Sequence, residues 1–371
     1  MTLGRNGNGY DISSQQYFRD LSAELRRKVP PARHQSVSEA RGKLGWEAFE
    51  FLLDEANLEH DKLDKEFKFK GHVTRAIDGT SFFVPRTDEL LEHFSPSKTK
   101  AEEGETHYPY GLCLAAINVF TAQPVCAVID DYRMSERELL RRMLKKFRPG
   151  DLSLLDRGLG GKDVYFDYDE RGQFFIHRSK TSGDRVAIYV QDFLKSGRKQ
   201  QVILLKVVEK ESRREKKMKL RLILGPTDSE GKPIVFVTNL VDKSRYKRVE
   251  LIELYKKRWG VETLYNRVKN LFRLERFHAR SYNGIMQEIF ANLLALSLAA
   301  VAVSAVVHED KLDPEVELPN FKNATEVVRR YLFAVIDQRI PRKKSNAIVK
   351  QIPKEVRALR YPIRPGRSYP R

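Results

Sequence analysis

The spacing of hydrophobic residues predicts two helices near the start of the chain. Apolar side chains recur every three or four residues over Gln15–Arg27 and Ser38–Ala56, the spacing that places them on one helix face. A Pro-containing break, KVPPARHQ, separates the two stretches. The Gly- and Asn-rich dozen residues before them lack this pattern and are expected to be disordered. We therefore expect a small helical module over residues 1–66.

From residue 67 onward the pattern changes to short apolar runs rich in β-branched and aromatic residues. Lys68–Pro85 and Tyr110–Asp130 contain such runs with turn residues between them, which is typical of hairpins. A capping box then predicts a helix at about Glu136–Phe147. The apolar run Asp151–Asp156 predicts the next strand. The order strand, helix, strand indicates an α/β fold.

Four further strands are expected between residues 185 and 240, joined as an antiparallel meander. They are the runs RVAIYVQDF, QQVILLKVVEK, MKLRLILG and IVFVTNLV. Two long helices should follow, at about Val249–Arg273 and Asn283–Val307. The second contains 19 uncharged residues, Ile289–Val307, long enough to cross a bilayer. The run stands alone and is interrupted by polar residues, so a central helix of a soluble fold is the preferred interpretation, and no membrane is expected.

Composition narrows the classes of function. The 371 residues carry a formal net charge of +18, so a polyanion is the expected partner. Hydrophobic residues make up 41%, too many for a disordered basic tail protein. The two cysteines, Cys113 and Cys126, form no CxxC pair, and no basic and apolar leader follows Met1, which favours a reducing cytoplasm. The eight histidines show no zinc-ligand spacing.

The positive charge is concentrated in two segments. Over half of it lies in the last 33 residues, whose net charge of +10 predicts general, salt-sensitive phosphate affinity. Residues 209–221 hold seven basic and three acidic side chains at an expected hairpin tip. A charged tip of this kind is either solvated or in contact with DNA phosphate, and the sequence leaves both open. The candidate phosphate contacts at this tip are Arg213, Arg214, Lys216 and Lys217.

The most informative stretch for chemistry is LYKKRWGVETLYNRVKNLFRLE. At about 100° per residue, Tyr255, Arg258, Glu262 and Lys269 fall within about 60° of arc on one helix face, and the opposite face is apolar. Arg and Lys can neutralise phosphate oxygens while Glu holds a cation. The alternative is an exposed face with one Arg–Glu pair and solvated cations.

Two aspartates favour the chemical interpretation. Asp78 ends the strand HVTRAID, and Asp156 ends the strand LSLLD, so both lie where loops begin and side chains can converge on a cleft. With Glu262 they supply three carboxylates on separate elements, the hard oxygen ligands that Mg²⁺ prefers. Two such ions can activate a water or a 3′-hydroxyl and stabilise the leaving oxygen of a phosphoryl displacement.

These residues stand in an order that resembles a known family. The pattern Y-x2-R-x3-E-x6-K at Tyr255, Arg258, Glu262 and Lys269 is similar to the signature of bacterial DDE transposases of the insertion-sequence-4 family. Further blocks resemble the same family over about residues 36–371. They are SVSEARGKLGWEAFEFLL, AIDGTSF, LLDRGLGGKDVYFDYDERGQFFIHRSK, VFVTNLVDKSRYKRVELIELYKKRWGVE and the final PGRSYPR.

The resemblance implies an α/β fold with an RNase H-like catalytic core, an inserted antiparallel β-strand domain and a small helical N-terminal module. The expected domains divide the chain into five segments. They are a helical module that forms part of an end-recognition domain (1–66), the first part of the core (67–184), the inserted β domain (185–245), the second part of the core with the Glu-bearing helix (246–310) and a basic C-terminal region (311–371).

The resemblance also implies cut-and-paste transposition with a hairpin intermediate and strand transfer. Two Mg²⁺ ions, replaceable by Mn²⁺, would be the cofactors. Asp78 would bridge them, while Asp156 and Glu262 would each complete one site. The expected DNA contacts are Tyr255, Arg258, Lys269 and Arg157. The expected partners are the double-stranded terminal inverted repeats and target DNA, bound by a homodimer.

Two departures from the family pattern keep alternatives open. The segment before the first Asp is shorter than usual, so one alternative is a truncated or decayed transposase that binds DNA without completing transposition. Neither tryptophan lies in the expected insertion, where some members use an aromatic residue to hold a flipped base; the substitutes there are Tyr189, Phe193 and Phe236. The other alternative is a non-transposing nuclease on the same core.

Overall fold

The computed structural model describes most of the chain and divides it into two compact units. The units are Asp64–Phe83 with His93–Asn270, and Met1–Leu63 with Val84–Glu92 and Leu271–Arg371. We call them the sheet unit and the helical unit. The residues that the structure describes are 34–63, 67–96, 107–183, 186–208, 215–258, 277–314, 316–336 and 341–363.

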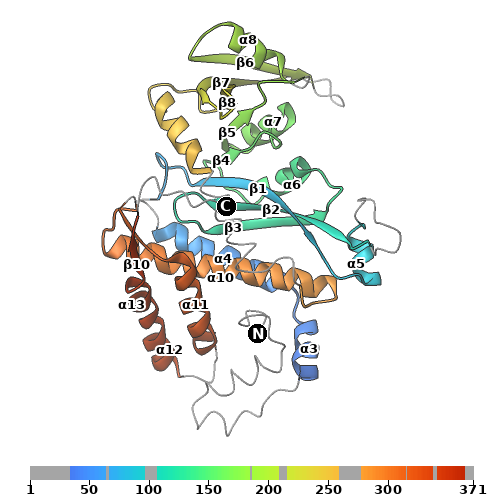
Figure 1. Cartoon of the computed structure of the whole chain (residues 1–371), viewed down its shortest axis with the longest axis vertical. Helices are drawn as coiled ribbons and strands as arrows, with labels where there is room; N and C mark the ends of the chain where they lie inside the picture. The colour runs from blue at the N-terminus through green and yellow to red at the C-terminus, as the bar shows by residue number, and fades with distance from the viewer. Residues whose placement is uncertain are drawn as a thin grey trace. The chain divides into compact units, whose positions relative to one another are not determined.

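A mixed sheet of eight strands forms the centre of the sheet unit (Figure 1). Its spatial order is β3-β2-β1-β4-β5-β8-β7-β6. The strands are β1 (Thr74–Phe83), β2 (Tyr110–Asn118), β3 (Pro124–Asp131), β4 (Leu152–Leu155), β5 (Phe174–Ser179), β6 (Gln200–Val208), β7 (Glu215–Thr227) and β8 (Pro233–Thr238).

The first five strands have the connectivity of an RNase H-like core. β1, β2 and β3 form an antiparallel meander, and β4 and β5 then join the other side of β1 in parallel. The two parallel connections contain the helices α6 (Glu136–Leu144) and α7 (Lys162–Glu170). A helical crossover is what a parallel pair of strands requires. The predicted fold class is therefore confirmed.

The helices α6, α7 and α8 (Ile188–Lys195) pack against the sheet and close its core. The α6 side chains Leu139, Leu140, Met143 and Leu144 are buried at the spacing of one helix face. The Ser135 hydroxyl accepts from the Arg137 amide, so the helix begins at the expected cap. Polar residues cover the outer face, and the sequence pattern of this helix is reproduced in the structure.

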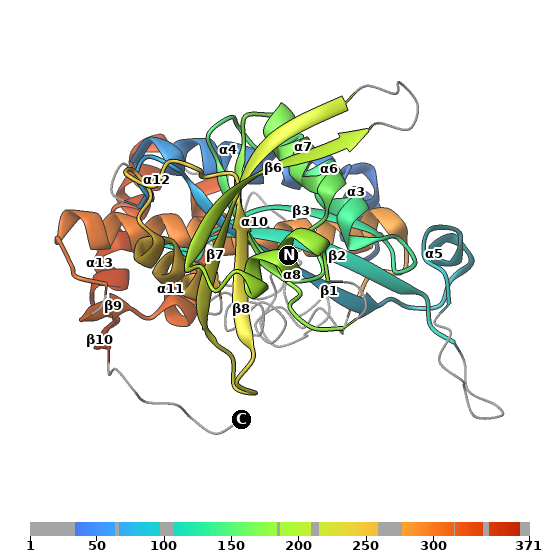
Figure 2. The same cartoon turned by 90° about the horizontal axis from the view of Figure 1, so that it is seen from above.

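The expected meander after residue 185 is present with one strand fewer. β6, β7 and β8 are antiparallel, Figure 2 shows β6 beside β7, and β8 joins β5, so they extend the same sheet. The prediction of a strand in RVAIYVQDF is wrong, because Ile188–Lys195 is helix α8, whose Val190 and Phe193 are buried one turn apart. The boundaries of an inserted domain stay a prediction.

The helical unit is built around the long helix α10 (Tyr282–Glu309), along which α4 (Glu47–Leu63) packs (Figure 1). By length and composition α10 could cross a membrane, but 67% of its most apolar window is buried within the fold. The expected helix Ser38–Ala56 is divided into α3 (His34–Lys43) and α4, and the expected helix Gln15–Arg27 lies outside the described residues. The remaining elements are α5 (Asp88–His93), α11 (Phe321–Ile336), α12 (Arg342–Val349), α13 (Gln351–Arg357), β9 (Glu317–Pro319) and β10 (Arg360–Pro362).

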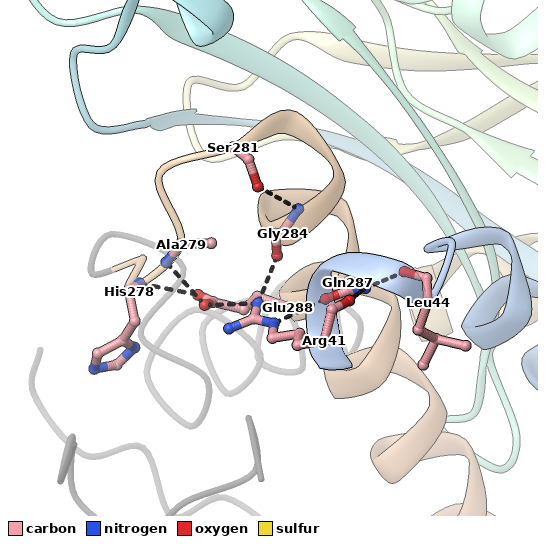
Figure 3. Close-up of polar contacts among 8 residues, drawn as sticks. All are labelled: Arg41, Leu44, His278, Ala279, Ser281, Gly284, Gln287 and Glu288. Carbon is pink, nitrogen blue, oxygen red and sulfur yellow. Dashed lines mark hydrogen bonds and ion pairs between the residues drawn. The ribbon is translucent and has the colours of Figure 1, made fainter. Parts of the chain in front are cut away.

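A buried polar cluster at the start of α10 connects three segments of the helical unit (Figure 3). The Glu288 carboxylate accepts hydrogen bonds from the backbone amides of His278 at 3.1 Å and Ala279 at 3.0 Å. It also pairs with Arg41 of α3 at 3.1 Å, and Arg41 donates through Nε to the Gln287 side chain at 2.8 Å. The cluster therefore fixes the chain that enters α10 and attaches α3 to it.

Candidate active site

The structure places Asp78 and Asp156 beside each other at one edge of the parallel strands. Ile77 of β1 is in register with Leu155 of β4, and each aspartate is the next residue along its chain. Asp156 directly follows the last residue of β4, but Asp78 lies inside β1, which continues beside β2 as far as Phe83, so the prediction that Asp78 ends its strand is wrong. The two aspartates meet where the pairing of β1 with β4 stops, at the carboxyl end of β4, and binding sites commonly form at such strand ends. Asp78 is half-buried, and the Asp156 side chain is 40% exposed.

Arg258 supplies the positive charge at this edge. It lies on the helix that begins at residue 248 and is described as far as residue 258, which we call the signature helix. Its guanidinium is 5% exposed, with Nη2 3.6 Å from the Asp156 carboxylate. Its charge also lowers the pKa of Asp78. The site thus combines two carboxylates with one buried cation.

The pKa of the Asp78 carboxyl is raised. Burial raises its pKa from the usual 3.8 to about 6, against the opposing effects of Arg258 and a hydrogen bond from the Gly79 amide. The charges of Asp156 and Glu136 raise it further. Ionising this carboxyl on its own costs free energy. A bound cation would offset that cost, because it stabilises the charged form of the carboxyl.

Tyr255 joins the signature helix to the strand that carries Asp156. Its hydroxyl donates to the Leu155 carbonyl at 2.9 Å, and its ring packs on Phe236 with 4.6 Å between ring centres. The side chain is fully buried. The expected phosphate contact of Tyr255 stays a prediction, as does that of Arg258.

The donor atoms present fit a hard divalent cation. Two aspartate carboxylates on adjacent strands are the ligand type that Mg²⁺ prefers. Among the residues that the structure describes, no three His, Cys, Asp or Glu side chains group together as a metal site. Glu262 and Lys269, the other two members of the signature, lie outside the described residues. The complete ligand set therefore stays a prediction.

Glu136 is a third carboxylate at this edge that the sequence pattern did not single out. A Cβ added to Gly79 would lie 2.3 Å from Glu136 Oε1, and one added to Gly158 would lie 3.5 Å from Oε2. Burial raises the pKa of Glu136, and the charge of Asp156 raises it further. In the sequence, Glu136 is the first residue of a capped helix, where an acid is ordinary.

A cavity of about 480 Å³ is lined in part by Arg157, the residue that follows Asp156. Arg157, Arg178 and Lys232 contribute its cations, and the hairpin between β7 and β8 forms much of its wall. Arg178 faces Asp228 at 3.7 Å. Arg157 is one of the predicted DNA contacts. Arg178 and Lys232 were missed, because nothing in their local sequence indicates that β5 and the β7–β8 hairpin meet.

The remaining candidates at the β6–β7 hairpin have protein partners where they are described. Lys216 pairs with Glu170 at 2.5 Å, and Lys217 pairs with Glu215 at 2.8 Å. Arg213 and Arg214 lie outside the described residues. Salt bridges at the surface are weak, so DNA phosphate could replace these carboxylate partners at little cost in free energy, and both interpretations of the tip stay open.

None of the three aromatic substitutes for a base-holding residue is exposed. Phe193 and Phe236 are buried, at 2% and 3% exposure. Tyr189 is half-buried and hydrogen-bonded to Tyr165. All three therefore contribute to the packing of the sheet unit, and a role in holding a flipped base stays a prediction.

The raised pKa of Asp78 predicts opposite effects of pH on stability and on metal binding. Between pH 3.8 and about 6 the folded protein holds a proton at Asp78 that the unfolded chain has released, so this carboxyl makes the fold less stable as pH rises through that window. Metal binding requires the deprotonated group and should strengthen over the same window. Titration of Mn²⁺ into the protein at pH 5.5 and 7.5 should show weaker binding and more proton release at pH 5.5. Equal affinity in wild type and Asp78→Asn at both pH values would contradict this.

Three comparisons relate this chain to known proteins. The sequence model described as "Transposase DDE domain" matches residues 69–298. The transposase InsG of insertion sequence element IS4 from Escherichia coli K12 is 24% identical over 270 residues, which are 71% of this chain and 59% of that protein. The cryo-EM structure of a piggyBac transposase synaptic complex with hairpin DNA is 11% identical, with a TM-score of 0.40 over 74% of this chain and 57% of that one.

The family match covers more than half of the chain and includes both aspartates and Arg258. The chain spans about three fifths of the length of the IS4 protein that it matches. It belongs to the DDE transposases of the insertion-sequence-4 family, whose members use divalent metal ions.

Proposed function

We propose that this protein cleaves DNA at the ends of a mobile element and joins the freed ends to target DNA. The observation that supports this most is the pair of aspartates where the pairing of β1 with β4 stops, with Arg258 beside Asp156. Carboxylates that hold cations next to a fixed guanidinium suit a reaction that builds negative charge on a phosphate.

The protein's own residues have distinct tasks in this proposal. Asp78, Asp156 and Glu262 would hold two Mg²⁺ ions, which Mn²⁺ could replace. When bound, the ions would activate a water or a 3′-hydroxyl and stabilise the leaving oxygen. Arg258 stays buried beside Asp156 and keeps the local charge balanced when a phosphate enters. Tyr255 holds the signature helix against the end of β4.

The proposed reaction follows the cut-and-paste scheme. Hydrolysis frees a 3′-hydroxyl at the element's end, that hydroxyl attacks the opposite strand to give a hairpin, and the hairpin is opened before insertion into target DNA. The protein would act on terminal inverted repeats as a homodimer in the bacterial cytoplasm, with residues 1–66 as part of the end-recognition module and residues 311–371 as a basic DNA-binding region.

The cavity lined by Arg157, Arg178 and Lys232 is a candidate contact for the DNA backbone. Arg178→Ala should weaken binding of end-bearing duplex and reduce the slope of log affinity against log salt by about one, because it removes about one phosphate contact. Arg171, which is exposed and follows the far end of α7, provides the control. An unchanged slope for Arg178→Ala, or an equal loss for Arg171→Ala, would show that the cavity does not hold DNA. Affinity at four salt concentrations measures both.

A cleavage assay tests the proposed function. The substrates are a duplex that carries the inverted repeat found beside the gene and a duplex with that repeat scrambled, each with Mg²⁺, Mn²⁺ or a chelator. We expect metal-dependent nicking at the repeat boundary, followed by a hairpin product. Equal cleavage of both duplexes would favour the non-transposing nuclease. Binding without cleavage under all conditions would favour the truncated or decayed transposase.

A further inference from the structure

The loop that carries Asp156 and Arg157, residues 156–161, lies against a buried histidine of the next strand. His177 of β5 is 4% exposed, and it is in register with Leu155, the last residue of β4. A Cβ added to Gly160 would lie 2.1 to 2.4 Å from three atoms of the His177 ring. Real Cβ atoms do not approach this closely, so the loop backbone rests directly on the imidazole.

Contacts with Tyr165 of α7 hold the His177 imidazole in place. The Tyr165 hydroxyl of α7 and His177 Nδ1 are hydrogen-bonded at 2.6 Å. The Tyr165 ring stacks on Phe175 at 4.6 Å between ring centres, and its hydroxyl also interacts with Tyr189 of α8. Because Tyr165 is 1% exposed, the ring has no room to move without repacking the core.

Other contacts hold the two ends of the loop, where the Asp156 carboxylate pairs with Arg258 at 3.6 Å and the Gly161 carbonyl accepts from the Tyr165 amide at 3.0 Å. Leu159 packs into the core, and its amide donates to the Asp156 carbonyl at 3.1 Å. Arg137 donates to the Gly158 carbonyl at 3.1 Å from an exposed position. A loop of six residues with three glycines gains little rigidity from its backbone. Its shape therefore depends on the surface beneath it.

We propose that His177, held by Tyr165, is a positioning residue that sets the conformation of residues 156–161 and thereby aims Asp156 at the metal site. The proposal rests on the proposed function of Asp156 as a metal ligand. Burial lowers the pKa of His177 to about 4, so the imidazole is neutral at physiological pH and adds no charge beside Asp156. Groups that orient a metal ligand typically change metal affinity by about 10–100-fold when they are removed.

The test compares Tyr165→Phe with Tyr168→Phe in the full-length protein. Both tyrosines are buried on α7 and contact Phe175, but only Tyr165 is bonded to His177. Tyr165→Phe and His177→Phe should raise the hydrogen-exchange rate of the Leu159 amide and weaken Mn²⁺ binding, each by about tenfold. Tyr168→Phe should change neither the Leu159 exchange rate nor the Mn²⁺ affinity, even if it lowers the thermal unfolding temperature as much as Tyr165→Phe does.

Glycine variants test the loop side of the same contact. Gly160→Ala should reproduce the effect of His177→Phe, whereas Gly158→Ala should leave Leu159 exchange unchanged, since a Cβ there meets Glu136 at an ordinary 3.5 Å. Equal effects of the two tyrosine variants, or Leu159 exchange that stays at the wild-type rate in His177→Phe, would overturn the proposal. If the proposed function is wrong, the wild-type protein will bind no Mn²⁺. In that case the exchange rate of the Leu159 amide still tests whether His177 sets the conformation of the loop.

Discussion

Asp78→Asn and Asp156→Asn should each lower the rate of end cleavage by about a thousandfold or more. Each removes one charged oxygen ligand from the pair that lies where the pairing of β1 with β4 stops. A metal ion contributes several kcal/mol of transition-state stabilisation, and each 1.4 kcal/mol corresponds to a factor of about ten in rate. Glu262→Gln should behave in the same way if this residue completes the ligand set.

Single-turnover cleavage of a labelled end duplex measures this loss, and a binding assay on the same duplex separates it from loss of affinity. The amides preserve shape, so binding should stay within a few-fold of wild type. Asp167→Asn is the matched control, because this aspartate is also close to an arginine, Arg141 at 2.6 Å, but lies on α7 and not on β1 or the loop after β4. If either active-site variant cleaves the duplex at a rate within tenfold of wild type, its aspartate is not a metal ligand of the site.

Glu288→Ala should lower the free energy of unfolding by about 3–5 kcal/mol, the usual cost of breaking a buried ion pair from one side. The carboxylate is 9% exposed and holds two backbone amides as well as Arg41. Its removal leaves a half-buried guanidinium and two amides without their acceptor. Because Arg41 of α3 pairs with Glu288, the substitution should also weaken the packing of α3 against α10 (Figure 3).

Denaturant unfolding measures this loss, with Glu309→Ala as the control. Glu309 pairs with Arg357 at 2.7 Å, at the other end of α10, and it is 56% exposed. Exposed pairs contribute about 0–1 kcal/mol, so the control should change little. Equal losses for the two variants would show that burial of the Glu288 cluster is not what stabilises it. A double replacement of Arg41 and Glu288 by apolar residues should recover much of the loss.

Much of the sheet unit could be predicted from sequence because its local patterns agree with its tertiary contacts. The runs that became β1, β4, β6, β7 and β8 are apolar and bounded by turn residues, and Asp156 follows such a run as expected. The end of β1 was placed too early, because Gly79 and Thr80 have the local pattern of a turn but continue the strand beside β2. The stretch at α8 failed because a run of nine residues carries apolar positions compatible with either a strand or a helix. In the structure this stretch is a helix, and Val190 and Phe193 are buried one turn apart because that face of the helix packs against the sheet.

The parts of the site that sequence did not predict depend on contacts between distant segments. Glu136 resembles any acid at a helix start until the fold brings it over Gly79. Arg178 is one of several cations until β5 meets the β7–β8 hairpin. His177 looks like a core histidine, and it gains meaning only from Gly160, which lies 17 residues earlier in the chain. Register and loop packing, rather than local pattern, decide all three.

A change of metal preference tests the central claim most directly. A thiolate is a softer ligand than a carboxylate and binds Mg²⁺ poorly, so Asp156→Cys should be inactive with Mg²⁺. If Asp156 binds the metal at which cleavage occurs, Mn²⁺ or Cd²⁺ should restore cleavage to Asp156→Cys while leaving Asp156→Ala inactive. Recovery of neither variant, or equal recovery of both, with the folded state intact and end binding preserved, would contradict the assignment of Asp156 as a metal ligand.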